Sequence, residues 1–190
     1  METAKYLDRT LAKYAGSFDI ERPYRINGKE YAAYGHYISQ QEKYVLTRKV
    51  NLWKIRGHEH VVFALCDRVT HDDLEEARRA MIEYMEPELV CSGNRYPEKD
   101  HMYSYLTFAF ICETKPDAET IREIERFRYS RDYLFSFRGR TEAHIICVDM
   151  ETKSVFTNRA ARQMKKFYLS TFREIQLGKP GYEEAFLGLK

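Results

Sequence analysis

Apolar residues recur every three or four positions in four segments of the chain, which is the spacing of an amphipathic helix. The first segment ends at Gly16, and the second follows Thr70, whose hydroxyl can form a capping box with Asp73. Pro87 is expected to end the second helix, because its ring clashes with the preceding turn. Asn158 is a good N-cap for the last helix. We predict helices over residues 2–15, 71–86, 117–127 and 158–176.

Shorter segments rich in β-branched and aromatic residues lie between these helices and are bounded by turn residues. Asn27-Gly28 is typical of a tight hairpin turn, and Gly139 marks another turn. The pattern predicts strands over residues 17–26, 30–38, 44–55, 58–66, 101–113, 133–137, 142–150 and 154–157.

Together these elements predict a single α+β domain over residues 1–176, followed by a short C-terminal tail over residues 177–190. Because most of the predicted strands are joined by short turns, we expect a largely antiparallel sheet of about seven strands. The helices are expected to pack on one face of this sheet. The tail is too short to fold alone, and its apolar residues are suited to docking on the body or on a partner.

The composition excludes several classes of protein. Of the 190 residues, 44% are hydrophobic and 32% are charged, which argues against a disordered or collagen-like chain. The longest apolar runs, Val61–Cys66 and Leu106–Cys112, are far shorter than the roughly 20 residues that span a bilayer. No basic segment followed by an apolar one marks the start for export. The sequence therefore predicts a cytoplasmic protein without a membrane partner.

Charge is segregated along a chain whose formal net charge is only +2. Residues 71–100 hold nine acids and four bases, whereas residues 153–173 hold six bases and no acid. Arginines alternate with aromatic residues over residues 122–140, and this mixture of guanidinium groups and flat rings is typical of phosphate and base binding. We predict an anion-binding surface made of Arg126, Arg128, Arg131, Arg138, Arg140, Arg159, Arg162, Lys166 and Arg173.

Two interpretations of this surface stay open. In the first, the clustered cations bind nucleic acid or a phosphorylated small molecule, because clustering creates a local attractive field and rewards counterion release. In the second, the same cations pair with the acidic helix of residues 71–88 and form ordinary solvated surface.

His58 and His60 are expected on the same side of one strand, because side chains alternate along a strand. Such a pair can ligate a divalent metal, although a His-x-His at an ordinary strand end is common. A third ligand has to come from another element, and the candidates in the sequence are Asp67, Asp100, His101 and Glu113. The alternative function is therefore a metal-assisted hydrolase with His58 and His60 as its first ligands.

Signatures of common enzyme classes are missing from the sequence. It contains no phosphate-binding loop, no dinucleotide-binding glycine motif, no serine-hydrolase elbow and no His-Glu-x-x-His helix. The best hypothesis is thus a non-catalytic binding domain whose basic surface takes an anionic ligand, and for this function no cofactor is expected. Aromatic-rich strands and the tail are suited to forming a homodimer.

Two further runs stand out, Phe-Arg-Tyr-Ser-Arg-Asp-Tyr-Leu-Phe-Ser-Phe-Arg-Gly over residues 127–139 and Thr-Asn-Arg-Ala-Ala-Arg over residues 157–162. They resemble an uncharacterised bacterial domain family with no assigned activity. The resemblance extends from Lys5 to about Phe172. It implies no mechanism and transfers no catalytic residue to this chain.

Overall fold

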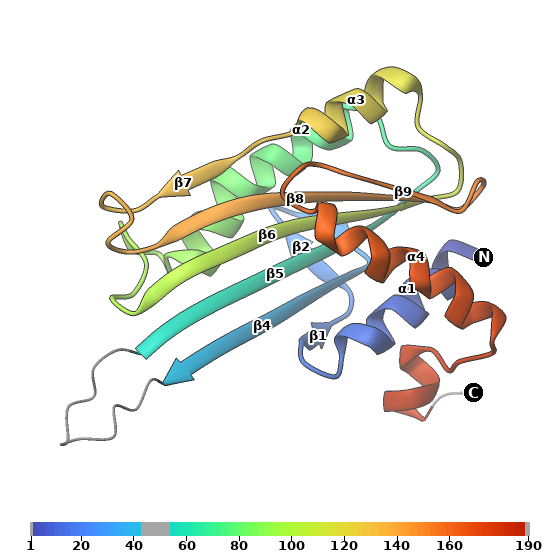
Figure 1. The fold of residues 1–190 in the computed structure, drawn as a ribbon, viewed down its shortest axis with the longest axis horizontal. Helices are drawn as coiled ribbons and strands as arrows, with labels where there is room; N and C mark the ends of the chain where they lie inside the picture. The colour runs from blue at the N-terminus through green and yellow to red at the C-terminus, as the bar shows by residue number, and fades with distance from the viewer. Residues whose placement is uncertain (1, 43–53, 189–190) are drawn as a thin grey trace.

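The computed structural model describes residues 2–42 and 54–188, so the predicted strand over residues 44–55 lies outside the described residues except for its last two positions. One mixed sheet of seven strands organises the fold, which confirms the predicted α+β class (Figure 1). Its strands pair in the order β1-β4-β5-β6-β8-β7, and β9 also pairs with β8. The strands are β1 (Asp19–Glu21), β4 (Ala33–Glu42), β5 (Lys54–Cys66), β6 (His101–Cys112), β7 (Ser130–Asp132), β8 (Arg140–Asp149) and β9 (Ser154–Thr157).

A separate hairpin of β2 (Tyr24–Ile26) and β3 (Lys29–Tyr31) lies on one face of the sheet. Asn27 and Gly28 have φ angles of 49° and 84°, as a two-residue hairpin turn requires, so the predicted turn is confirmed. Buried side chains at Ile26 and Tyr31 attach the hairpin to the main core.

The centre of the sheet is parallel, and here the prediction of a largely antiparallel sheet is only partly right. β4 pairs with β5, and β1, β7 and β9 pair with their neighbours, in antiparallel fashion. In contrast, β5 pairs with β6 and β6 with β8 in parallel. The reason is that helical crossovers, rather than short turns, connect these long strands, and a crossover returns the chain in the same direction.

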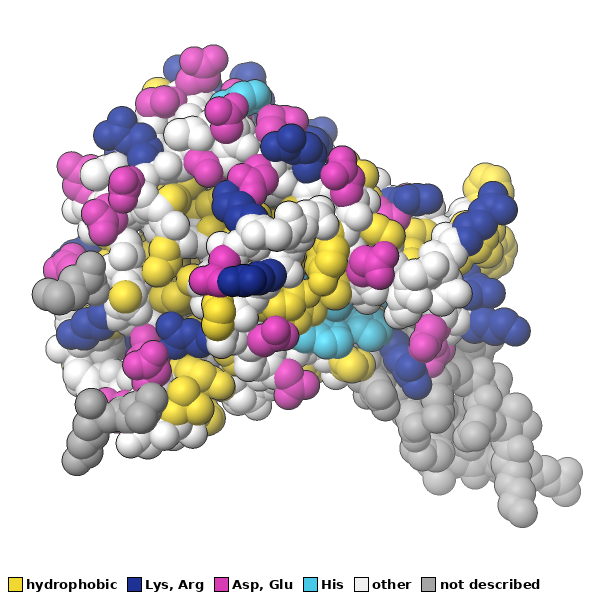
Figure 2. Space-filling model, turned by 180° about the vertical axis from the view of Figure 1, so that it is seen from behind, with side chains coloured by type: hydrophobic (Ala, Val, Ile, Leu, Met, Phe, Trp, Pro, Cys, Tyr) yellow, Lys and Arg dark blue, Asp and Glu magenta, His cyan; other side chains and the backbone are white. Residues whose placement is uncertain are grey.

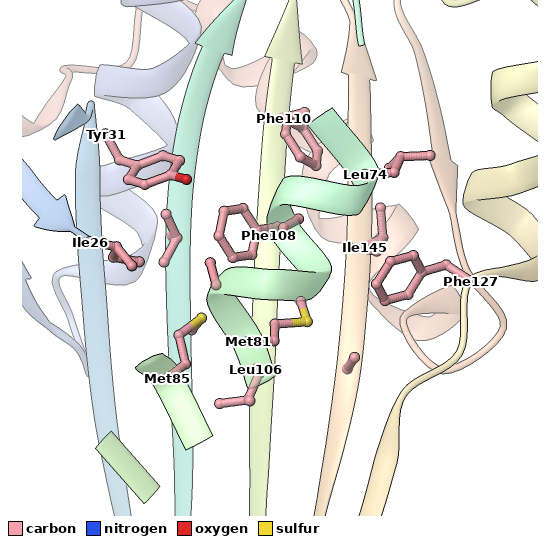
Figure 3. Packing of buried hydrophobic residues seen from close by; sticks show 14 of the residues in the cluster. Ile26, Tyr31, Leu74, Met81, Met85, Leu106, Phe108, Phe110, Phe127 and Ile145 are labelled. Atoms are coloured by element: carbon pink, nitrogen blue, oxygen red, sulfur yellow. The ribbon is translucent and has the colours of Figure 1, made fainter. Parts of the chain in front are cut away.

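Helices cover both faces of the sheet, which contradicts the prediction that they pack on one face. One face carries α2 (His71–Ala80), the π-helix η1 (Met81–Val90) and α3 (Ala118–Arg126), and the other carries α1 (Glu2–Tyr14) and α4 (Lys165–Gln176). The central strand β5 is apolar on both faces and therefore needs cover on both. Val62 belongs to the first core, and Val61 and Phe63 belong to the second. Figure 3 shows the first core, where Leu74, Met81 and other helix residues lie over the strands.

The second helix continues through Pro87, although this residue was expected to end it. Thr70 and Asp73 form the predicted capping box at its start. From Met81 the helix widens into π-type turns that run to Val90. Wider turns move the preceding carbonyl away from the proline ring, which removes the clash that ends an α-helix.

The aromatic segment before Gly139 forms a turn rather than the predicted strand over residues 133–137. Leu134, Phe135 and Ser136 all have positive φ angles, and Phe135 is 95% exposed. Alternating aromatic residues are typical of a strand, but a strand also needs a pairing partner. Of this segment, only residues 130–132 pair with β8. Gly139 is required at the end of this turn, since a Cβ there would lie 2.3 Å from the carbonyl oxygen of Met102.

The last helix begins later than predicted. Asn158 is followed by a turn and a short 3-10 helix, η2 (Arg162–Met164), and α4 starts only at Lys165. The basic residues of the predicted helix over residues 158–176 are therefore divided between this turn, η2 and α4. After α4 the chain folds back on α1 through η3 (Glu183–Leu187), where the Glu183 amide donates to Asp8. Within residues 2–42 and 54–188, no helix has the length and apolar character needed to cross a membrane.

Candidate functional site

Three histidines from two neighbouring strands meet at one place on the sheet, and we call them the histidine group. His36 comes from β4, and His58 and His60 come from β5. One nitrogen of each ring lies within 4.8 Å of one nitrogen of each of the others. His36 Nε2 and His58 Nδ1 are 3.3 Å apart. These three imidazoles thus converge on a volume of the size that a single ion occupies.

Antiparallel pairing of β4 and β5 fixes this arrangement. In the register of the two strands, His36 lies directly opposite His60, and His58 lies diagonally from it, opposite Ile38. Because side chains alternate along a strand, all three rings lie on the face that also carries the β2–β3 hairpin. The His36 and His60 rings stack almost in parallel, with centroids 4.5 Å apart and planes 8° apart. Backbone hydrogen bonds of the sheet therefore position the group.

His60 carries an unsatisfied nitrogen in the interior of the protein. Its side chain is buried, and Nδ1 lies 2.7 Å from the hydroxyl of Tyr34, which stacks on Tyr24. Nε2 has no hydrogen-bond partner, and no other buried side-chain nitrogen or oxygen in residues 2–42 and 54–188 shares this state. Leaving such an atom unpaired costs about 1–3 kcal/mol, so its persistence requires an explanation. A ligand on Nε2 provides one.

All three imidazoles favour the neutral form. Burial lowers the pKa of His36, and burial together with the neighbouring His36 and His101 lowers the pKa of His58 to about 4. Burial lowers the pKa of His60 further below its usual range. Neutral imidazole is the form that donates a lone pair to a metal, so the environment holds these rings ready for coordination.

The histidine group suits a divalent transition metal. Zinc binds histidine nitrogen at about 2.0–2.1 Å, which places the nitrogens of a tetrahedral site about 3.4 Å apart. The 3.3 Å contact between His36 and His58 already has this spacing. His36 and His58 are half-buried, and Figure 2 shows histidine side chains at the surface of the face that carries α2. An ion held here would keep one side open to solvent.

The third member of the histidine group, His36, comes from a strand that sequence reasoning did not connect to the pair. His101, one of the candidates from the sequence, has hydrogen-bond partners at both ring nitrogens. One lies 2.7 Å from the Arg138 carbonyl and the other 2.8 Å from the Ser104 hydroxyl. Asp100 pairs with Arg56 at 3.0 Å. Asp67 and Glu113 directly follow the C-terminal ends of β5 and β6, and neither belongs to the histidine group. His36 was missed because only the strand register shows that it faces His60.

The predicted basic residues differ in what they contact. Structural contacts occupy some of them: Arg131 pairs with buried Glu86 at 2.6 Å, Arg138 donates to the Pro97 carbonyl, and Arg140 lies 3.4 Å from Glu142. Of the nine residues in the predicted surface, only Arg131 pairs with the acidic helix of residues 71–88 in the described chain. Pairing with that helix therefore does not neutralise the rest.

Four of the nine predicted residues line two cavities beside β8. Arg128 and Arg159 line both cavities, Arg140 lines the first, and Arg162 lines the second. Arg126, Lys166 and Arg173 are exposed and line neither cavity. The structure thus brings together four of the nine residues named from the sequence, and adds Lys165 to them.

Comparison with known proteins gives a family but no activity. No curated protein and no solved structure matches the chain. Residues 2–170 match a family described as a domain of unknown function (DUF8052). This match covers most of the chain and confirms the resemblance to a family without an assigned activity. The chain belongs to the DUF8052 family.

Proposed function

We propose that this protein binds a divalent transition metal, with zinc as the best fit to the ligand type, through His36, His58 and His60. The observation that carries the proposal is the buried Nε2 atom of His60, which lacks a hydrogen-bond partner, in a group of three imidazoles of which one nitrogen each lies within 4.8 Å of one nitrogen of the others. An ion bound at Nε2 would give this buried atom the partner that buried polar groups normally have.

The surroundings of His60 support this role. Metal-bound histidines usually donate their second ring N–H to an oxygen, which fixes the tautomer and the ring orientation. The Tyr34 hydroxyl is 2.7 Å from Nδ1 of His60 and is suited to accept such a bond. Burial raises the pKa of Tyr34, so its oxygen stays a neutral hydroxyl. With Nδ1 as the donor, Nε2 presents a lone pair.

The arrangement favours a reactive site over a structural one. Structural zinc sites are usually closed by four protein ligands, whereas three histidines with an open position are typical of catalytic zinc. A metal held in this way lowers the pKa of its bound water to near neutrality, so metal-assisted hydrolysis is the reaction class that the histidine group fits best. The cytoplasmic location, bacterial origin and homodimer remain predictions from the sequence.

A competitive titration tests the proposed function. The metal-free protein is titrated with Zn²⁺ in the presence of a chromophoric chelator, and we expect one zinc per chain. His36→Gln and His60→Gln should each weaken binding at least 100-fold. His71→Gln is the matched control, because His71 is exposed and pairs with Glu123 far from the group, and it should bind zinc like the original chain. Absence of stoichiometric binding, or equal losses in His71→Gln and His60→Gln, would refute the proposal.

A further inference from the structure

A second site lies beside β8, away from the two strands that carry the histidine group, and we call it the arginine cleft. It consists of two cavities of about 400 and 520 Å³ that share Arg128 and Arg159. β8 and the segment after α3 border the first cavity, and the turn after β9 borders both. Because β6 separates β8 from β5, which carries two of the three histidines, and because none of the three lines either cavity, the cleft is distinct from the proposed metal site.

One buried side chain, Asn158, fixes the backbone beside the two arginines that both cavities share. Asn158 is 2% exposed, and its amide nitrogen donates to the carbonyls of Phe127 and Ala143, at 3.2 and 2.9 Å. Its oxygen accepts from the amides of Ile145 and Ala161, at 3.0 and 3.2 Å. Asn158 thereby joins the end of α3, strand β8 and the turn after β9.

Arg128 and Arg159 directly follow residues held by this amide, Phe127 and Asn158 itself. The carbonyl of Arg128 also accepts a bond of 3.1 Å from the Arg78 guanidinium. The backbone of both arginines is therefore anchored before any ligand arrives, which lowers the entropic cost of binding.

Cations outnumber acids around the cleft. The guanidinium groups of Arg128, Arg159 and Arg162 make no hydrogen bond or ion pair with any described residue, and Lys165 lines the second cavity beside them. The acids in the lining are Glu142, which faces Arg140 at 3.4 Å, and Glu125. Unpaired guanidinium groups present forked donors that match the oxygens of a phosphate.

We propose that the arginine cleft binds the phosphate group of a small phosphorylated molecule, with Arg128 and Arg159 as the central ligands. Two observations favour a small molecule over a polymer. The cavities have the volumes typical of small-ligand pockets, and Glu125 and Glu142 interrupt the positive track that a nucleic-acid backbone would follow.

Half-buried aromatic residues also line the cleft and extend the proposal to a ligand that carries a flat ring. Tyr129 borders the first cavity and Phe156 the second. A ring on the ligand can stack on either side chain while its phosphate contacts the shared arginines. A nucleoside monophosphate has this combination of groups and is the natural probe.

The test is an NMR titration of the metal-free protein at low salt with AMP, adenosine, pyrophosphate and a single-stranded DNA oligomer. AMP should bind saturably and shift the signals of the Arg128 and Arg159 side chains, while adenosine should not. Arg159→Ala should weaken AMP binding at least tenfold. Arg173→Ala removes the same charge from a residue outside the cleft and should change it less than twofold. His36→Gln should bind AMP unchanged, which separates this proposal from the metal site.

Three results would overturn the proposal. The first is no saturable shift with either AMP or pyrophosphate at millimolar concentration. The second is an equal loss in Arg159→Ala and Arg173→Ala, since a diffuse field would then explain the binding. The third is tight binding of the DNA oligomer without binding of AMP, which would identify the surface as a nucleic-acid interface.

Discussion

The histidine group and the arginine cleft differ in how the fold positions their polar side chains. The histidine group sits on two paired strands, where the backbone register alone brings His36 to His60. The arginine cleft is formed largely by turns and segment ends. Hydrogen bonds of one buried amide side chain, Asn158, hold these segments together. The first site holds neutral rings half inside the protein, and the second holds permanent charges in water. The comparison teaches that rigidity comes from the sheet in one case and from a single side chain in the other.

Removal of Asn158 should have the largest effect and should affect only one of the two sites. Asn158→Ala leaves two buried carbonyls and two buried amides without their partner, so we expect a loss of about 4 kcal/mol in the free energy of unfolding. Urea denaturation measures it. Asn94→Ala is the control, because the exposed Asn94 donates only to the nearby Ser92 carbonyl. If the variant unfolds less than 1 kcal/mol more easily than the control, Asn158 does not hold the cleft together.

Acid should destabilise the fold through a histidine outside both sites. His144 is 4% exposed and stacks on Tyr105, and burial lowers its pKa to about 4. In the unfolded chain its pKa is about 6.5, so between pH 6.5 and 4 the unfolded state binds the extra proton and stability falls as the pH falls. The full shift corresponds to about 3 kcal/mol.

His144→Phe keeps a ring against Tyr105 but removes this titration. Denaturation at pH 7 and at pH 4 should therefore show a smaller acid-induced loss in the variant than in the original chain. Parallel losses in the two proteins would show that the fold does not lower the pKa of His144.

Substitutions of Arg131 and Arg159 should rank in opposite order for their effects on stability and on AMP binding. Arg131 contacts Glu86, which is 2% exposed and also accepts from the Tyr129 hydroxyl. Arg131→Ala leaves this carboxylate without its cation, and because Arg131 itself is 57% exposed we expect a loss of about 2 kcal/mol rather than the larger cost of a fully buried pair.

Arg159→Ala should change stability by less than about 0.5 kcal/mol, because an exposed side chain without a partner contributes little. AMP binding should show the reverse order, with the larger loss in Arg159→Ala. Thermal denaturation and the NMR titration of the two variants measure both quantities. A similar pattern in both variants would remove the distinction between structural and ligand-binding arginines.

The smallest predicted loss of binding concerns the hydrogen bond between Tyr34 and His60. Tyr34→Phe keeps the ring that stacks on Tyr24 but removes the oxygen 2.7 Å from Nδ1 of His60. Loss of such a partner typically lowers metal affinity tenfold or more, and tenfold corresponds to about 1.4 kcal/mol. The zinc titration measures it against Tyr24→Phe, whose hydroxyl contacts Tyr84 instead. An unchanged affinity in Tyr34→Phe would show that the bond does not tune the site.

Local signals in the sequence predicted the helices and turns well. The capping box at Thr70, the Asn27-Gly28 hairpin and the apolar spacing of the first helix involve neighbours in the chain, and each is present in the structure. Pro87 was misinterpreted because a widened helix tolerates it. The segment over residues 133–137 was misinterpreted because alternating aromatic residues occur in exposed turns as well as in strands.

The sequence could not predict the parts of the two sites that depend on contacts between residues far apart in the chain. His58 and His60 were predicted on one side of a strand by parity alone, but His36 required the register between β4 and β5. Charge clustering indicated the basic residues, yet it did not separate Arg131, which the fold uses for Glu86, from Arg159 in the cleft. That separation depends on which acids the tertiary fold places nearby.

The most direct test of the metal site is a ¹⁵N NMR spectrum of the histidine rings before and after one equivalent of Zn²⁺. Of the six histidines in the chain, His36, His58 and His60 should shift to values typical of metal-bound nitrogen, with His60 bound through Nε2. His71 and His144 should keep their signals, since neither belongs to the histidine group. Unshifted signals of His36, His58 and His60 at saturating zinc, or an Nε2 signal of His60 that stays protonated, would contradict the proposed function.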